Sequence, residues 1–202
     1  MRVMAARGSP AHDFFNLYRH GFARVALATP LVRIGDPMAN AAATLALMQQ
    51  AARRKAVVAV FPELGLSAYS CEDLFHQQAL LKASGEALAW LLARSKSLPI
   101  AAFVGLPVVV DGLLYNCAAL ICRGELLGLV PKTYLPNYRE FYELRQFTPG
   151  GDGVKDISFD GRTVPFGPLI FRLKENPGLR LFAEICEDLW GPAPPSSFAA
   201  LA

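Results

Sequence analysis

Three side chains of complementary chemistry stand just beyond apolar runs of strand length: Glu63, Lys132 and Cys186. The ends of neighbouring strands meet at one edge of an open α/β sheet, which is where ligands bind, so these side chains are expected to converge. A thiol, a carboxyl group and an ammonium group in one place are the set that splits an amide through a thioester. The spacing therefore predicts a hydrolytic site with a cysteine nucleophile.

Each residue has a distinct task in such a reaction. Cys186 would attack the carbonyl carbon, helped by the N-terminal dipole of the helix or turn that begins after it. Glu63 would take the thiol proton and return it to the leaving ammonia. Lys132 would hold the developing oxyanion together with a backbone N–H near Glu187. Taken singly, each has an ordinary explanation as a solvated cap, a surface charge or an inert core thiol, and only the joint pattern favours catalysis.

The elements that must position these residues follow from hydrophobic patterns and turn residues. An N-cap followed by proline at Asp36-Pro37 predicts the start of the first helix, and Pro99 ends the second. The expected elements are a strand over Phe22–Leu31, a helix over Ala39–Arg54, a strand over Ala56–Phe61, a helix from Gln78, and strands over Ile100–Val110, Leu114–Cys122, Leu126–Val130 and Leu179–Ile185. Hairpin turns are expected at Asp111-Gly112 and at Arg123-Gly124-Glu125. This order predicts an α/β protein with a mixed sheet.

The segment after Lys132 is rich in aromatic and charged residues and ends at Thr148-Pro149-Gly150-Gly151-Asp152-Gly153, which indicates a loop. These glycines do not follow a strand and open a helix, so neither a dinucleotide-binding motif nor a Walker loop is predicted. The proline-rich stretch Gly191–Pro195 is expected to be a surface loop.

Composition excludes several classes of protein. A chain of 202 residues with 53% hydrophobic content has material for one large core, and its net charge is only +3. The basic cluster at residues 53–55 is typical of a helix C-terminus more than of a nucleic-acid patch, so no nucleic-acid partner is expected. The first ten residues lack the apolar stretch of a signal peptide, and no segment predicts a membrane span.

The four cysteines show neither zinc-site spacing nor the density of a secreted disulfide framework, which predicts a cytoplasmic protein without a metal site. Cys71 lies close to Glu63 in sequence, but a small buried thiol explains it better than a second nucleophile. His76 could pair with Cys186, although the glutamate and lysine explain that cysteine better. Cys117 and Cys122 fall in a predicted strand and are expected to be structural.

The same residues carry a family resemblance. FPELGLSAYSCEDL, PKTYLPNYREFYELRQFTPG and LFAEICEDLW resemble, in order, the three signature blocks of the nitrilase-like carbon-nitrogen hydrolases. The resemblance is closer still to the N-terminal glutaminase domain of glutamine-dependent NAD synthetase, through the opening FFNLYRHGFARVALATP, the run KTYLPNYREFYE and the block EICEDLW.

The resemblance implies a base at Glu63, an oxyanion-stabilising lysine at Lys132 and a nucleophile at Cys186. It also implies that Tyr138 contacts the substrate glutamine, and that Glu143 supports catalysis by orienting the lysine or assisting proton transfer. From the residues alone, Tyr138 could equally fill a loop with its aromatic ring, and Glu143 could be a surface charge.

The fold that the resemblance implies is a four-layer αββα sandwich with mixed sheets. Residues 1–202 would form one truncated glutaminase domain that lacks the closing strands, and the ATP-dependent synthetase domain would be absent. Such a chain is expected to present an unpaired sheet edge and an apolar face, and to form a homo-oligomer.

The expected reaction is glutamine amide hydrolysis that supplies ammonia for the ATP-dependent amidation of deamido-NAD to NAD. L-glutamine and a separate NAD synthetase domain are the expected partners. No cofactor is expected in this domain, whereas ATP, Mg and deamido-NAD belong to the synthetase domain. Two alternatives stay open: another nitrilase-superfamily amidase such as an ω-amidase or carbamoylase, and an inactive fragment that only binds a partner.

Overall fold

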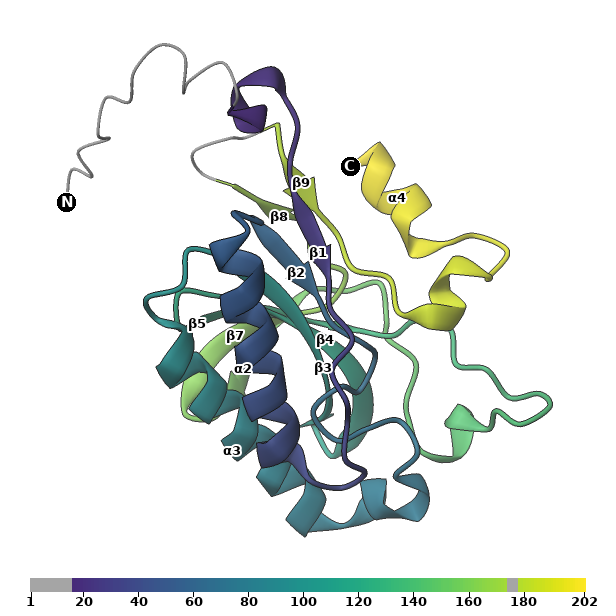
Figure 1. Ribbon diagram of the computed structural model, residues 1–202. Helices are drawn as coiled ribbons and strands as arrows, with labels where there is room; N and C mark the ends of the chain where they lie inside the picture. Colours follow the sequence, from purple (N-terminus) through teal and green to yellow (C-terminus); the bar gives the residue numbers. More distant parts are fainter. Residues whose placement is uncertain (1–15, 174–177) are drawn as a thin grey trace.

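The central feature of the computed structural model, which describes residues 16–173 and 178–202, is a seven-stranded mixed sheet (Figure 1). The strand order is β1-β2-β3-β4-β5-β7-β6; the first three strands are parallel, and β3, β4 and β5 form an antiparallel meander. The strands are β1 (Val25–Leu27), β2 (Val58–Val60), β3 (Ala101–Val110), β4 (Leu113–Cys122), β5 (Glu125–Pro131), β6 (Lys155–Phe159) and β7 (Arg162–Phe166). The predicted α/β class with a mixed sheet is confirmed.

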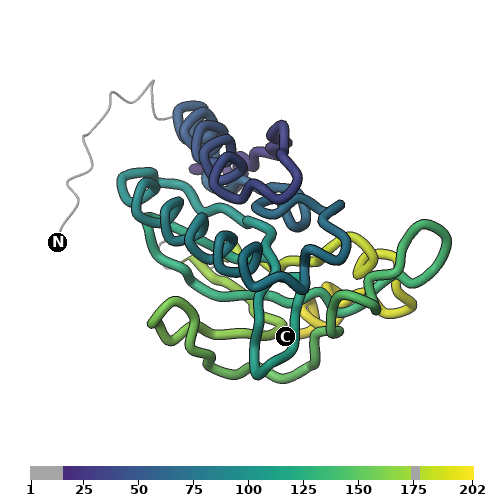
Figure 2. Tube along the Cα trace, turned by 90° about the horizontal axis from the view of Figure 1, so that it is seen from below, coloured from purple at the N-terminus to yellow at the C-terminus, as the bar shows by residue number. Residues whose placement is uncertain are grey.

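Two helices, α2 (Pro37–Arg53) and α3 (Gln78–Ser95), lie side by side over one face of this sheet (Figures 1 and 2). The N-cap prediction for the first is confirmed, because the Asp36 carboxylate accepts the Ala39 N–H at 3.1 Å. The basic cluster at residues 53–55 does fall at the end of α2, as expected. Alanine and leucine side chains of both helices pack into the main core cluster against the sheet.

Both predicted hairpin turns of the meander are confirmed. Asp111 and Gly112 have φ of 51° and 78°, and Arg123 and Gly124 have φ of 49° and 81°. Two successive residues with positive φ match the twist of the flanking strands, which allows a two-residue connection. The long strands β3 and β4 therefore pair along their full length.

The β6–β7 hairpin was not predicted. Its turn, Asp160-Gly161, has the same positive φ values, 49° and 70°, and the flanking residues alternate between apolar and polar. The loop predicted after Lys132 ends near Gly153, as expected, but the chain that follows forms this hairpin and joins the large sheet beside β5. The Asp-Gly pair between alternating residues is the signal that would have identified this hairpin.

Three strand predictions were too long. The strand predicted over Phe22–Leu31 pairs only at Val25–Leu27, where it forms a sheet edge. The strand predicted over Ala56–Phe61 is reduced to β2, and that over Leu179–Ile185 is reduced to β9 (Arg180–Leu181). An apolar run marks burial, whereas strand length depends on how far a neighbour follows alongside.

The opposite face of the large sheet carries a two-stranded sheet of β8 (Phe171–Arg172) and β9. The Phe103 ring points to this face, where it meets the Phe171 ring at 6.1 Å between centroids. Coverage is partial, because a cavity of about 600 Å³ remains beside the small sheet, lined by residues such as Ala101 and Leu120. Helices, large sheet and small sheet form successive layers in the predicted order.

The remaining elements are short: η1 (Leu17–His20), η2 (Glu72–His76), η3 (Glu143–Arg145), η4 (Cys186–Leu189) and α4 (Pro195–Leu201). The stretch expected as a surface loop, Gly191–Pro195, connects η4 to the start of α4. None of the described helices combines the length and apolar composition needed to cross a membrane. The expectation for the first ten residues lies outside the described part of the chain.

Candidate active site

The loop that carries Glu63 lies against β3, and a glycine makes that approach possible. A Cβ added at Gly105 would lie 2.3 Å from the Leu64 nitrogen and 2.7 Å from the Pro62 oxygen. The loop is also hydrogen-bonded to β3, since the Leu66 N–H donates to the Gly105 carbonyl at 3.0 Å. The sheet therefore fixes the backbone that presents the glutamate.

Lys132 lies at the end of β5, where it is completely buried between two carboxylates. Its Nζ is 2.6 Å from Glu63 Oε1 and 2.8 Å from Glu143 Oε1, and its side chain is 0% exposed. The glutamates are 15% and 5% exposed. Burial alone would lower the pKa of Lys132, but the two carboxylates outweigh it and raise the pKa above its ordinary value. The lysine is therefore a fixed cation.

Glu143 is not a surface charge, so that alternative is wrong. Its Oε1 accepts hydrogen bonds from Lys132 Nζ and, at 2.7 Å, from the Tyr69 hydroxyl, while its Oε2 is buried without a hydrogen-bond partner among the described residues. Burial raises the pKa of Glu143 despite the opposing lysine and tyrosine bonds. Burial and the same carboxylate also raise the pKa of Tyr69.

Asn116 on β4 completes the surroundings of the predicted base. Its Nδ2 donates to Glu63 Oε1 at 2.6 Å, and its backbone oxygen accepts the Lys132 N–H at 2.8 Å. One residue thus contacts both partners of the ion pair. Sequence reasoning missed Asn116, although an amide inside the apolar strand β4 is a signal, because a buried polar group requires a partner.

Cys186 begins η4 and lines a cleft of about 280 Å³ together with Glu63. Burial, followed by the charge of Glu63, raises the pKa of the thiol, while the charge of Lys132 opposes the shift. A short helix does begin at Cys186, but η4 has only four residues, and burial keeps the pKa of the thiol above its ordinary value. A thiol that stays protonated needs a base to react. Glu63 and Glu184 both line the cleft, and Glu63 is the carboxylate whose charge acts most strongly on the thiol.

Tyr138 and the residue after the nucleophile form a second polar contact. The Tyr138 hydroxyl donates to the Glu187 carboxylate, with distances of 3.0 and 3.1 Å to its two oxygens. This bond raises the pKa of Tyr138. The ring is half exposed and meets Phe141 edge-on at 6.2 Å between centroids. The loop after Lys132 runs beside the C-terminal segment of the chain (Figure 2).

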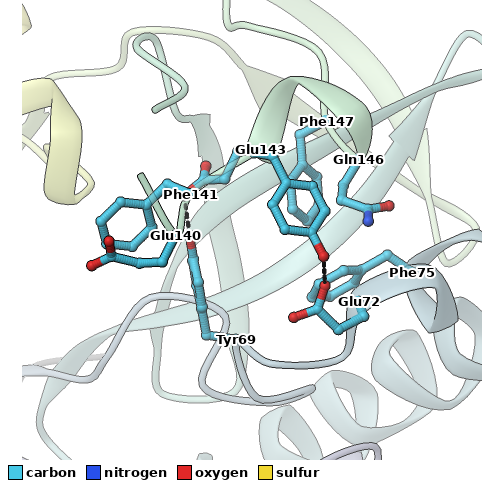
Figure 3. A pocket seen from close by; sticks show the side chains of 9 residues that line it. Tyr69, Glu72, Phe75, Glu140, Phe141, Glu143, Gln146 and Phe147 are labelled. Carbon is cyan, nitrogen blue, oxygen red and sulfur yellow. Dashed lines mark hydrogen bonds between the residues drawn. The ribbon is translucent and has the colours of Figure 1, made fainter. Parts of the chain in front are cut away.

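A pocket opens on the Glu143 side of the ion-pair cluster (Figure 3). Aromatic and acidic residues line it: Tyr69, Glu72, Phe75, Glu140, Phe141, Tyr142, Glu143, Gln146 and Phe147. Figure 3 shows Tyr69 reaching up to Glu143. The Tyr142 hydroxyl donates a hydrogen bond to the Glu72 carboxylate. The loop after Lys132 therefore packs on η2.

Two of the other cysteines are buried. Cys71 has its sulfur 3.0 Å from the Ser67 oxygen. Cys117 lines the same cleft as Cys186, but it is 0% exposed and belongs to the main core cluster, and burial raises the pKa of its thiol. None of the four cysteines forms a disulfide. His76 belongs to η2, near Asp73, whose pKa is lowered mainly by its hydrogen bond with Arg145. Within residues 16–173 and 178–202, no group of His, Cys, Asp and Glu side chains forms a metal site.

The chain is similar to known proteins over most of its length. A family model described as carbon-nitrogen hydrolase matches residues 24–195. The glutamine-dependent NAD(+) synthetase of Mycobacterium bovis is 47% identical over 191 residues, which are 94% of this chain and 28% of that protein.

Two solved structures are similar in fold. A glutamine-dependent NAD(+) synthetase from Cytophaga hutchinsonii matches with a TM-score of 0.75 and 27% identity over 82% of this chain and 28% of that chain. An amidase from Nesterenkonia sp. matches with a TM-score of 0.60 and 22% identity over 84% of this chain and 57% of that chain. The family match spans most of the sequence, including all three predicted catalytic positions, and the chain belongs to the carbon-nitrogen hydrolase family.

Proposed function

We propose that this chain hydrolyses the side-chain amide of glutamine through a thioester on Cys186. The observation that carries the proposal is the wholly buried Lys132, held by Glu63 and Glu143 beside a cleft that the Cys186 thiol also lines. A buried cation with two carboxylates costs stability, so its presence next to a nucleophile argues for a chemical task.

The residues divide the reaction into balanced steps. The Cys186 sulfur bonds to the amide carbon while Glu63 accepts the thiol proton, and Lys132 stabilises the oxyanion. The C–N bond then breaks, and Glu63 returns the proton so that ammonia leaves and a thioester remains. Water, deprotonated by Glu63, attacks the thioester and releases glutamate and the thiol. Because the thiol pKa is raised, the base is needed in the first step.

The Tyr138–Glu187 pair supports glutamine as the amide. A carboxylate one residue after the nucleophile can accept the α-ammonium group of an amino acid, and the tyrosine holds that carboxylate in place. A simple amide without this charge would gain nothing from the pair. The similarity to NAD(+) synthetases named as glutamine-dependent supports the same substrate.

The released ammonia would serve the ATP-dependent amidation of deamido-NAD to NAD on a synthetase domain, with ATP and Mg used there. This chain spans 28% of the length of the mycobacterial relative, so NAD formation is a proposal for an assembly and not for these residues alone. Purified chain given glutamine, ATP, Mg and deamido-NAD should make no NAD unaided. NAD formation under those conditions would contradict this division of labour.

Substrate choice is tested by measuring ammonia release from glutamine, asparagine, α-ketoglutaramate and a carbamoyl amino acid. The glutaminase proposal predicts that glutamine has the highest kcat/KM and that Cys186→Ala abolishes release. Tyr138→Phe should raise KM for glutamine more than for α-ketoglutaramate, which lacks the α-ammonium group. Preference for α-ketoglutaramate or the carbamoyl compound would favour an ω-amidase or a carbamoylase instead. A folded chain that releases no ammonia from any amide would favour the partner-binding alternative.

A further inference from the structure

One buried carboxylate joins the two segments that carry the lysine and the cysteine. Asp188 is 2% exposed, and its Oδ1 accepts the N–H groups of Thr133 at 2.9 Å and Tyr134 at 2.7 Å. Its Oδ2 accepts the Ile185 N–H at 3.0 Å. Thr133 directly follows Lys132, and Ile185 directly precedes Cys186.

A helix cap would explain only one of these three bonds. The Ile185 contact is local and ties the carboxylate to the turn on which it lies. The bonds from Thr133 and Tyr134 come from residues 55 and 54 positions away in the chain. Capping η4 does not require them, so Oδ1 serves the connection between the two segments.

The backbone at the nucleophile is strained, which gives an independent reason for an anchor. Cys186 has φ of 47°, in the left-handed region that non-glycine residues avoid. Such a conformation is unfavourable and persists only when its surroundings hold it. The Asp188 bond to the preceding N–H is a contact that does so.

We propose that Asp188 is a positioning residue that fixes the Cys186 sulfur relative to Lys132 and Glu63. It contacts no reacting atom and acts through the backbone on either side of the site. Displacement of reacting groups by about 1 Å can cost on the order of 100-fold in rate, so such an anchor matters for catalysis beyond its effect on folding. The proposal deepens the glutaminase function and rests on it for the chemistry, but its test does not need glutamine.

The test measures the rate at which iodoacetamide alkylates Cys186 as a function of pH, with the site identified by peptide mass spectrometry. Asp188→Asn keeps the size but turns one acceptor into a donor, so it repels one of the three N–H groups. Asp188→Glu keeps the charge but adds a methylene, so it separates the effect of position from that of charge.

A matched control is Asn40, which is also fully buried with three hydrogen bonds. It accepts the Arg33 N–H at 2.7 Å and donates to the oxygens of Arg33 and Leu66 at 2.8 and 2.9 Å. Asn40→Asp creates the converse mismatch near the start of α2. It should lower the melting temperature without changing the alkylation profile.

Burial is the largest cause of the raised thiol pKa, followed by the charges of Glu63, Lys132, Glu143 and Glu187, of which the lysine alone lowers it. In both Asp188 variants the turn at Cys186 loses its anchor and the thiol becomes less buried. The pH midpoint of the alkylation profile should therefore fall toward the pKa of an ordinary thiol. With a glutamine-analogue chloroketone, Cys186 should also be labelled at least about 10-fold more slowly in both variants than in the wild type. Profiles like wild type in folded variants would overturn the proposal.

If neither variant folds, amide hydrogen exchange of the wild type decides. Thr133, Tyr134 and Ile185 should exchange slowly and as one group, whereas fast or unrelated exchange would overturn the proposal. Failure of the wild type to label with the chloroketone, with a normal iodoacetamide result, would count against the glutaminase function and leave the positioning role intact.

Discussion

Replacement of Lys132 by methionine is the sharpest test of the buried ion-pair cluster. Methionine nearly fills the space of the lysine stem but removes the only cation that contacts Glu63 Oε1 and Glu143 Oε1 among the described residues. Two carboxylates would then face each other away from bulk water. One of them must be protonated, or the cluster must open.

The burial of the ion pair sets how much stability Lys132→Met should lose. Breaking a buried ion pair by removing one partner costs about 3–5 kcal/mol. For a domain of this size, each kcal/mol lowers the melting temperature by about 2–4 °C, so Lys132→Met should melt about 6–20 °C below wild type at neutral pH. Lys82 is a suitable control, since it is 79% exposed and pairs with Glu86 only at 3.8 Å. Lys82→Met should cost less than about 0.5 kcal/mol.

The stability lost in Lys132→Met should become smaller as the pH falls. Burial already raises the pKa of Glu143 above its ordinary 4.5, and removal of Lys132 raises it further. Below pH 4.5 the carboxyl group is protonated in the folded and unfolded states, so the difference from wild type should narrow there. Thermal melts followed by circular dichroism across this range provide the assay. A neutral-pH difference no larger than that of Lys82→Met would refute the buried cluster.

Three further predictions concern the residues around the cluster. Gly105→Ala should destabilise the protein by about 1–3 kcal/mol in urea unfolding, because the added Cβ would lie 2.3 Å from a backbone atom. The control Gly85→Ala, on α3 with no atom near the added Cβ, should stabilise the protein by about 0.5–1 kcal/mol in the same assay. Asn116→Ala should cost about 1–3 kcal/mol in the same assay and slow ammonia release, because Glu63 loses a buried donor; unchanged values would contradict the contact. Because burial raises the pKa of Glu143, the stability that this group contributes is fully present below pH 4.5 and is lost as the pH rises through the folded-state pKa. Glu143→Gln should therefore flatten the plot of the free energy of unfolding against pH in this range, and an unchanged slope would contradict the prediction.

Local signals in the sequence predicted the scaffold well. The cap at Asp36, the turns at Asp111-Gly112 and Arg123-Gly124 and the helix over residues 78–95 depend on interactions within a few residues, and the structure contains each of them. The lengths of β1, β2 and β9 depend on a pairing partner elsewhere in the chain, which is why periodicity overestimated them.

The site was predictable only in part. The spacing of Glu63, Lys132 and Cys186 after apolar runs indicated that they would converge, and the first two are in direct contact while the third lines the same cleft as Glu63. The contacts of Asn116 and Asp188 join residues 53 to 55 positions apart, and no local pattern encodes such pairs. The raised thiol pKa also depends on burial that appears only in the folded chain.

The central claim is that one sulfur, one carboxylate and one ammonium group act together on glutamine. It is tested most directly by mass-spectrometric mapping after treatment with a glutamine-analogue chloroketone. We predict a single adduct on Cys186 in the wild type, formed far more slowly in folded Glu63→Gln and Lys132→Met variants and prevented by excess glutamine. An adduct on Cys122 instead, or labelling of Cys186 at equal rates in all three proteins, would contradict the account.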